Sequence, residues 1–372
     1  MSTILITTLI SILISLPLKT SSYNNSINAT YEQKRLLGKL FLSFIPIWII
    51  TCFRWSDRYF GDTGYLTGSY WKFYENCINH NNRLFDILQR EEPFVWGSIK
   101  IATMFGIGWF KILLILSTEY IIAFIYFLGR NCRIPFLGIC LYSFLGLFLF
   151  PFHALRQAAS EIFILIAYDI MLHKKTNSKY TLLKACVVLF LGMIAHTSCI
   201  IMIPLFIIAN KHYKLKNLFL FTFLFVILSP FCGFILQSII SILRPSYSER
   251  LMNEARSFNI TYVILGAFFV YICILNIKKN YPQSYFCINL VFLYFISTFY
   301  SKFLLDPYRI IHMFSPIIIV SVCRIIESLQ KKSNKIIIKY MLLLILFILF
   351  IKNFNNYLYI SAISNLSFIK GL

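Results

Sequence analysis

Residues 182–209, LLKACVVLFLGMIAHTSCIIMIPLFIIA, form an almost unbroken apolar run with His196-Thr197-Ser198 near its middle. One continuous helix of this length would be about 42 Å long at about 1.5 Å per residue. The hydrocarbon core of a bilayer is only about 30 Å thick, so a single spanning helix would have to tilt strongly. The run therefore indicates two short membrane segments that meet at His196.

The lysines on both sides of this run favour the same interpretation. Two segments place the lysines of 173–181 and 211–216 on one side of the membrane, whereas a single span places them on opposite sides. Lysine and arginine accumulate in cytoplasmic loops. The sequence therefore predicts that both loops are cytoplasmic and that His196 lies at a turn on the outer side.

The composition identifies the chain as an integral membrane protein. Of its 372 residues, 59% are hydrophobic and 13% are charged, and the mean hydropathy is +0.74; a soluble domain carries about 25% charged residues. The formal net charge of +21 is dispersed between apolar runs, so no nucleic-acid partner is expected. The ten cysteines show neither metal-ligand nor disulfide spacing.

The apolar runs predict an all-α fold, a single polytopic membrane domain over residues 1–372 with about 12 (10–12) transmembrane helices. The first run lacks the basic start and the cleavage site of a signal peptide, and we interpret it as a retained helix. The candidate spans lie near 2–18, 39–53, 109–128, 134–151, 157–172, 182–195, 198–210, 217–240, 260–277, 284–300, 309–325 and 338–352.

Two long segments, 54–108 and 241–258, are predicted to be extracytoplasmic loops. The first carries many aromatic side chains among its charges, which is typical of amphipathic helices at headgroup depth. Residues 93–105 are apolar but too short to span a bilayer. The sequence therefore predicts interfacial helices within the first long loop.

Arginines and lysines separate between the two sides of the predicted membrane domain. Most lysines fall in the cytoplasmic loops, which membrane orientation explains. Nine arginines fall on the outer side, where that rule does not place them: Arg54, Arg58, Arg83, Arg90, Arg156, Arg244, Arg250, Arg256 and Arg309. Because guanidinium groups bind phosphate and carboxylate bidentately, the contrast predicts an anionic substrate delivered through the membrane.

The first outer loop holds two candidate site elements. Arg54 leads through a polar stretch to Asp62, a carboxylate that could act as a general base toward a hydroxyl group. The alternative is a solvated salt bridge in a loop. Glu92 and Pro93 begin the apolar segment of that loop, and an ordinary helix start is the alternative explanation for them.

Two further elements lie at the outer ends of predicted spans. Arg156, Gln157 and Glu161 begin one span, and ionisable groups at membrane depth are usually paired or functional. A structural Arg156–Glu161 pair is the alternative. His196 is either a second candidate base or a structural histidine whose hydrogen bonds are satisfied.

Three isolated charges complete the set of candidates. Arg250, in the second long loop, and Arg309, at the start of a late span, could bind an anion. The alternative for Arg309 is an ion pair with Asp306. Glu119, in the middle of a span, is expected to pair internally, because an unpaired charge there is costly.

Taken in order, these elements resemble the EpsG-like family of bacterial polysaccharide polymerases, which is related in role to Wzy-type O-antigen polymerases. The second element lacks the family's spacer, the third has Ser at its last position, and the fourth lacks the family's Phe. The resemblance covers about residues 40–210 and is weaker in the rest of the chain. The elements are Arg54 with Gly61-Asp62-Thr63-Gly64-Tyr65, Glu92-Pro93-Phe94, Arg156-Gln157-Ala158-Ala159-Ser160 and Ala195-His196-Thr197-Ser198.

The resemblance implies a glycosyltransferase of GT-C-like architecture that moves an oligosaccharide from undecaprenyl diphosphate to another carrier-linked repeat unit. The reaction would occur at the periplasmic face of the bacterial inner membrane and build a surface polysaccharide such as the O-antigen of lipopolysaccharide. Asp62 matches the family's outer-face aspartate. The implied partners are the lipid-linked oligosaccharide, membrane lipids and, as a further candidate, a chain-length regulator protein. No cofactor is expected, and a divalent metal is left open without a signal for it.

Two alternatives to a polymerase remain, namely a flippase and another transferase that uses lipid-linked donors. A flippase for lipid-linked glycans would distribute charges through its spans around a central cavity, whereas here the charges gather in outer loops. An O-antigen ligase or a single-sugar transferase would use the same lipid donors. The sequence also lacks a Gly-x-Ser-x-Gly elbow and a His-Glu-x-x-His motif. It has no P-loop either, so transport driven by nucleotide hydrolysis has no support within this chain.

The predicted turn at His196 can be tested by cysteine accessibility. We expect Thr197→Cys, in a cysteine-free background, to react with a membrane-impermeant thiol reagent added from outside. The reason is that two short segments return the chain to the lysine-rich side. Labelling of Thr197→Cys only after the cytoplasm is opened would contradict this topology.

Overall fold

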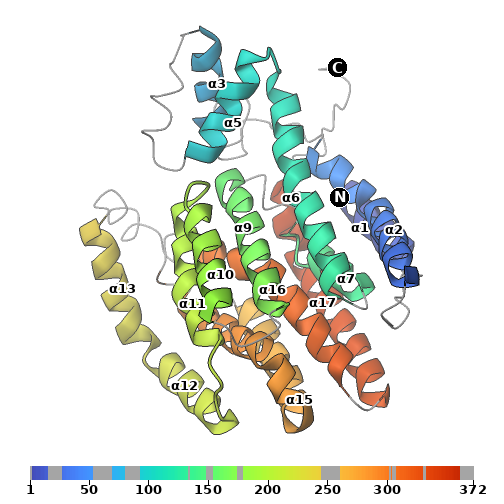
Figure 1. The fold of residues 1–372 in the computed structure, drawn as a ribbon, viewed down its shortest axis with the longest axis vertical. Coiled ribbons are helices and arrows are strands. Elements are labelled where there is room, and N and C mark those ends of the chain that lie inside the picture. Colours follow the sequence, from blue (N-terminus) through green and yellow to red (C-terminus); the bar gives the residue numbers. More distant parts are fainter. Residues whose placement is uncertain are drawn as a thin grey trace. The chain divides into compact units, whose positions relative to one another are not determined.

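The regular structure of the described residues is helical, with no strand among them (Figure 1). This confirms the predicted all-α fold. The chain divides into two compact units, one formed by Met1–Ile203 with Tyr340–Leu372 and the other by Pro204–Lys339. The computed structural model describes residues 2–15, 27–52, 69–79, 93–132, 135–147, 154–173, 179–243, 260–300, 303, 307–329 and 332–360.

The first unit is organised around one long apolar helix, α6. Its helices are α1 (Ser2–Ser15), α2 (Ile27–Cys52), α3 (Ser69–Asn79), α5 (Pro93–Met104), α6 (Trp109–Asn131), α7 (Pro135–Phe144), α9 (Leu155–Leu172), α10 (Lys179–Gly192), the 3-10 helix η3 (Thr197–Ile201) and most of α17 (Lys332–Ile360). Helix α6 packs against both α2 and α9, α1 packs against α2 and α7, and α10 packs against α9. These contacts make α6 the element that joins the two halves of the unit.

Aromatic rings fill the space between α2, α6 and α7. Phe124 and Tyr142 stack with ring centroids 4.4 Å apart, and Phe44 lies 5.5 Å from Tyr142. Beside them, Trp48 donates a hydrogen bond from Nε1 to Thr118 Oγ1 at 2.8 Å. The indole N–H is thereby satisfied by α6, so α2 and α6 are joined by a polar contact as well as by apolar packing.

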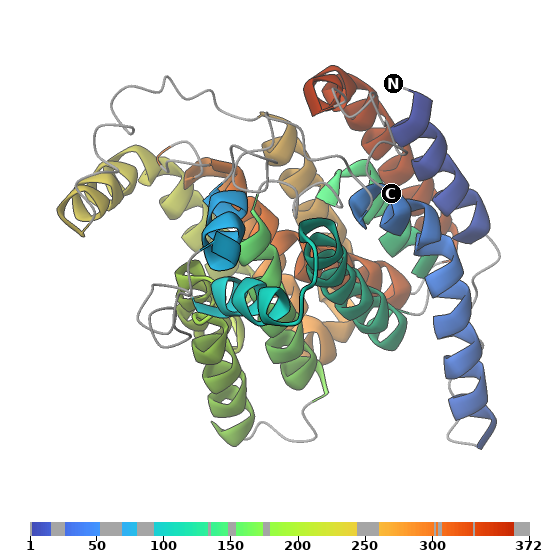
Figure 2. The same ribbon diagram turned by 90° about the horizontal axis from the view of Figure 1, so that it is seen from above.

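The short helices α3 and α5 lie side by side near one end of α6 and α9 (Figures 1 and 2). Trp96 of α5 contacts Tyr70 and Phe73 of α3, with ring centroids 4.8 and 4.9 Å apart. The predicted helices of the first long loop are therefore confirmed at 69–79 and 93–104. Their position at the membrane interface stays a prediction.

The apolar run 182–209 is interrupted as predicted. Helix α10 ends at Gly192, and after a turn the chain forms a 3-10 helix, η3 (Thr197–Ile201), and then α11 (Met202–Ala209). A Cβ on Gly192 would lie 2.6 Å from Cys199 Sγ, although a straight helix would separate these positions by about 10 Å. The run therefore breaks sharply between its two halves and does not form one straight helix.

In the second unit, the predicted span 217–240 is wrong as a single helix. Helices α12 (Leu215–Ile227) and α13 (Ser229–Leu243) meet at Leu228 with a bend of 64°. Pro230 explains the break, because proline disfavours helical geometry in the residue before it and removes a backbone donor.

Helix α15 (Ile260–Tyr300) is a hairpin, not one straight rod. The rings of Phe269 and Tyr294 lie 6.2 Å apart, whereas a straight helix would separate them by about 37 Å. A Cβ on Gly266 would meet Phe295 at 2.9 Å, so glycine allows the two halves to approach closely. The two apolar segments predicted at 260–277 and 284–300 are thus confirmed as neighbours joined by a reversal.

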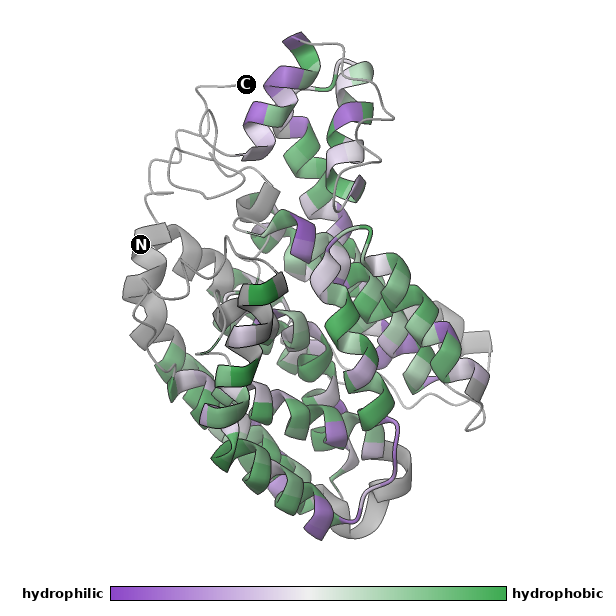
Figure 3. Cartoon of the chain, turned by 90° about the vertical axis from the view of Figure 1, so that its left-hand side faces the viewer, coloured by the Kyte–Doolittle hydropathy of each residue, from purple (hydrophilic) through white to green (hydrophobic). Residues whose placement is uncertain are grey.

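Helices α16 (Pro307–Ser328) and α17 (Lys332–Ile360) complete the described chain. Among the described residues, Lys111–Asn131 and Ile311–Ser328 are long and apolar enough to cross a bilayer, and the bent pair α12–α13 would add a third span. Apolar residues cover much of the described helices (Figure 3), whereas in α3 the buried residues Tyr70, Phe73, Tyr74 and Cys77 lie along one face. The apolar helices support a membrane protein, and the number of about twelve spans stays a prediction.

The close approach at Gly192 generates a stability prediction. We expect Gly192→Ala to destabilise the protein by about 1–3 kcal/mol, because the new methyl group would also lie 2.9 Å from Phe163 Cβ. The matched control is Gly97→Ala in α5, where an added Cβ meets nothing within 4 Å. The two variants are compared by thermal unfolding in one detergent, and equal melting temperatures would contradict the prediction.

Candidate functional site

The guanidinium of Arg156 lies against aromatic rings of α3 and α5. Arg156 belongs to the first turn of α9 and is half-buried. Its Cζ lies 5.8 Å from the ring centroid of Tyr70 and 5.7 Å from that of Trp96. Both distances are within the range of cation–π attraction, about 6 Å. The two rings therefore lie beside the guanidinium, a group whose planar fork can bind phosphate or carboxylate bidentately.

Phe94, at the start of α5, contacts both the turn before His196 and helix α9, which carries Arg156. Its backbone N–H donates to the carbonyl of Ile194 at 3.1 Å, in the turn that precedes His196. Its ring meets Phe163 of α9 edge-on at 6.4 Å. The described residues of three of the four predicted elements, at 93–94, 156–160 and 195–198, therefore belong to neighbouring segments, although about 100 positions of sequence separate the first from the last.

Glu161 is paired with a tyrosine of α6. Tyr120 donates its hydroxyl hydrogen to Glu161 Oε2 at 2.7 Å, and only 1% of each residue is exposed. Glu161 Oε1 has no hydrogen-bond partner among the described residues. The alternative of an Arg156–Glu161 ion pair is therefore not what the structure shows, because Arg156 stacks on rings and Glu161 takes Tyr120.

Gln157 is also buried, with no exposed surface. The Ser160 hydroxyl donates to the Gln157 carbonyl at 2.7 Å, within the same helix. Gln157 and Glu161 were predicted to bind substrate, and in this structure both lie inside the protein beneath Arg156. Of the three, Arg156 is the one that reaches the surface.

His196 caps the 3-10 helix that follows it. Its Nδ1 accepts a hydrogen bond from the backbone N–H of Ser198 at 3.3 Å, and Ser198 Oγ lies 3.2 Å from the same nitrogen. A neutral imidazole whose Nδ1 accepts carries its proton on Nε2. In this arrangement His196 presents a donor at Nε2, which suits a capping role better than that of a base.

Four predicted site residues lie outside the described residues: Arg54, Asp62, Glu92 and Arg250. Arg309 lies in the first turn of α16 in the second unit, and its side chain is likewise outside the description. Within the described part of the chain, no three His, Cys, Asp or Glu side chains are placed to hold a metal ion.

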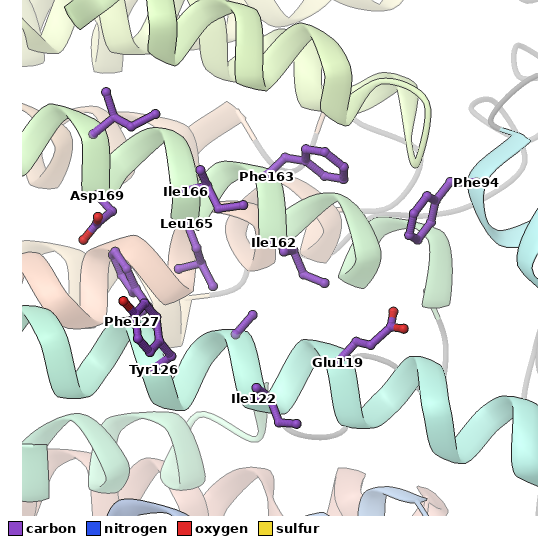
Figure 4. A pocket seen from close by; sticks show the side chains of 12 residues that line it. Phe94, Glu119, Ile122, Tyr126, Phe127, Ile162, Phe163, Leu165, Ile166 and Asp169 are labelled. Carbon is purple, nitrogen blue, oxygen red and sulfur yellow. The ribbon is translucent and has the colours of Figure 1, made fainter. Parts of the chain in front are cut away.

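A groove runs between α6 and α9, with a volume of about 710 Å³. Figure 4 shows Glu119 directed into it, close to Ile162 and Phe94. No hydrogen bond or ion pair joins Glu119 to the other described residues. The expected internal partner of Glu119 is thus not found among the described residues, and its side chain faces the groove.

The sequence did not identify Tyr70, Trp96 and Tyr120 as members of the site. Tyr70 and Trp96 belonged to the aromatic residues of the first long loop, and Tyr120 lay unremarked in an apolar span. A signal for Tyr120 was available, because a carboxylate buried at membrane depth needs a donor. Nothing in the sequence showed which donor that would be.

The chain resembles one known family over most of its length. The sequence model of the EpsG family matches residues 39–367. No curated protein matches the chain, and no solved structure does.

The Tyr120–Glu161 pair generates a prediction for stability. We expect Tyr120→Phe to cost about 1–3 kcal/mol, because it leaves a buried carboxyl group without a donor. Tyr120→Phe combined with Glu161→Leu should recover most of that loss, since both polar groups are then removed together. Thermal unfolding of the single and double variants measures this, and a double variant no more stable than Tyr120→Phe would contradict the pairing.

Proposed function

Because the chain belongs to the EpsG family, we propose that it polymerises oligosaccharide repeat units carried on undecaprenyl diphosphate. The reaction joins one repeat unit to another at the periplasmic face of the bacterial inner membrane. The family points to a role of the polysaccharide-polymerase type, and the apolar helices fit a membrane enzyme. The donor, its carrier and the GT-C-like architecture belong to the proposal.

The observation that carries the proposal is the position of Arg156. Its guanidinium rests on two aromatic rings where three sequence elements meet. The leaving group of the donor is a lipid diphosphate, on which negative charge grows as the glycosidic bond breaks. A fixed guanidinium can stabilise that charge, and such preorganised stabilisation is usually the largest catalytic contribution. The neighbouring rings also suit the apolar faces of sugars.

The acceptor hydroxyl needs a base, and we assign that role to Asp62. Asp62 lies between Gly61 and Thr63-Gly64, and glycine lets a backbone come close to a ligand. A general base contributes about 10²–10⁴-fold to the rate. His196 then acts as a hydrogen-bond donor, since its Nδ1 already accepts from Ser198.

The remaining arginines would complete the binding of the diphosphate and sugars. Arg54, Arg250 and Arg309 are the proposed additional anion contacts, because bidentate groups suit phosphate. Glu92, directly before α5, would contact sugar hydroxyls. Gln157 and Glu161 would act beneath the site, where their burial lets them hold the first turns of α9 and therefore Arg156.

The function is tested with purified protein in proteoliposomes supplied with lipid-linked repeat units. A polymerase yields a ladder of products that differ by one repeat unit. A ligase or single-sugar transferase yields one transfer to a separate acceptor, and a flippase moves the substrate across the bilayer without forming a glycosidic bond. Either of the last two results would overturn the proposal.

Arg156→Lys is expected to lose most of the polymerising activity although the positive charge is retained. Lysine offers a point charge, whereas a guanidinium offers a planar fork and a face that stacks on rings. The readout is the length of the product ladder at equal amounts of folded protein in the membrane. A normal ladder from Arg156→Lys together with none from Arg156→Ala would reduce the role of Arg156 to charge alone.

A further inference from the structure

We propose that the groove between α6 and α9 binds the isoprenoid chain of the lipid-linked substrate and thereby brings its diphosphate to Arg156. This inference rests on the proposed function and adds a site for the hydrocarbon part of the donor. The groove has a volume of about 710 Å³, within the range of ligand sites, about 300–1,000 Å³.

The walls of the groove have the chemistry of a hydrocarbon site. The lining is mostly aliphatic and includes Ile122 and Ala123 of α6 and Ile162 and Ile166 of α9. The lining positions of each helix extend over about 12 Å, from 119 to 127 and from 162 to 170. A flexible apolar chain laid along this wall would bury surface that is otherwise open.

One end of the groove is continuous with the candidate site. Phe94 and Phe163 line the groove, and Phe94 lies two positions before Trp96, whose ring contacts Arg156. Along α9, the lining begins at Ile162, about 9 Å from Arg156. A lipid whose first isoprene units lie beside Phe94 would therefore have its diphosphate within reach of the guanidinium.

The other end of the groove is closed by polar contacts. Asp169 lies 3.1 Å from Arg130 Nε and accepts a hydrogen bond from Asn131 Nδ2 at 2.9 Å. His173 lies 3.3 Å from the same carboxylate oxygen, and this hydrogen bond raises the pKa of His173. The Asp169 carboxylate is thus neutralised by its neighbours, and these contacts join α6 to α9 where the apolar walls end.

Chemical modification of Glu119 can show whether the groove is occupied. It lies near the Phe94 end and has no hydrogen bond or ion pair with other described residues. A carboxyl group in an apolar setting reacts with a hydrophobic carbodiimide, whose addition to the acid leaves a stable acylurea on the side chain. A chain lying in the groove would cover Glu119 and block this reaction.

The first test compares two tryptophan substitutions on α6. Ile122 lines the groove and is 45% exposed; Ile115, two turns earlier, is 42% exposed and is not part of the lining. The substrates are repeat units on an undecaprenyl or on a geranyl diphosphate. We expect Ile122→Trp to raise the KM for the long-chain substrate about tenfold or more, because each buried methylene changes affinity about fourfold. The KM for the short-chain substrate should not change, and Ile115→Trp should alter neither.

The outcomes separate this inference from the proposed function. Polymer formation with an equal loss in Ile122→Trp and Ile115→Trp, or with no preference for the long chain in the unsubstituted protein, would overturn the groove and leave the function standing. No polymer from either substrate would overturn the function. The groove is then decided by the second test, which needs no turnover.

The second test measures labelling of Glu119 by dicyclohexylcarbodiimide in the unsubstituted protein. Mass spectrometry locates the adduct, and its absence in Glu119→Gln confirms the site of reaction. We expect undecaprenyl diphosphate to reduce the labelling several-fold, while inorganic diphosphate, which has no hydrocarbon chain, does not. Equal protection by phosphatidylglycerol would assign the groove to ordinary phospholipid, and no protection by undecaprenyl diphosphate would overturn the proposal.

Discussion

The interrupted helix at residues 193–196 imposes the constraint on which the candidate site depends. The end of a helix leaves backbone carbonyls and N–H groups without partners inside the helix, so other parts of the protein or solvent must satisfy them. Here the N–H of Phe94 reaches the carbonyl of Ile194, and His196 receives the N–H of Ser198. The start of α5 is thus held at the turn. This hydrogen bonding gives a physical reason for distant sequence elements to meet where a function needs them.

Beneath that turn, α9 is fixed on several sides. The Tyr120–Glu161 hydrogen bond joins it to α6, and Gly192 lets α10 approach Phe163 closely. A catalytic guanidinium gains most when it does not have to reorganise during the reaction. The buried pair and the tight glycine contact limit movement of the helix that carries Arg156, while the groove on its other face stays open.

Much of the fold could be predicted because apolar run length and proline are read directly from sequence. The break near His196, the helix beginning at Pro93 and the paired segments of 260–300 followed from those signals. The bend at Leu228 was missed because apolar residues continue through it, although Pro230 marked the place. The partners of Arg156 and Glu161 could not be predicted from the sequence. They depend on how helices pack together whose segments lie far apart in the chain.

The interruption within 182–209 also has a consequence for biosynthesis. Helix α10 has 14 residues and α11 has 8, whereas a segment that inserts independently into a bilayer needs about 20 apolar residues. If this run enters a membrane, we therefore expect its two halves to insert together, because neither helix reaches that length alone.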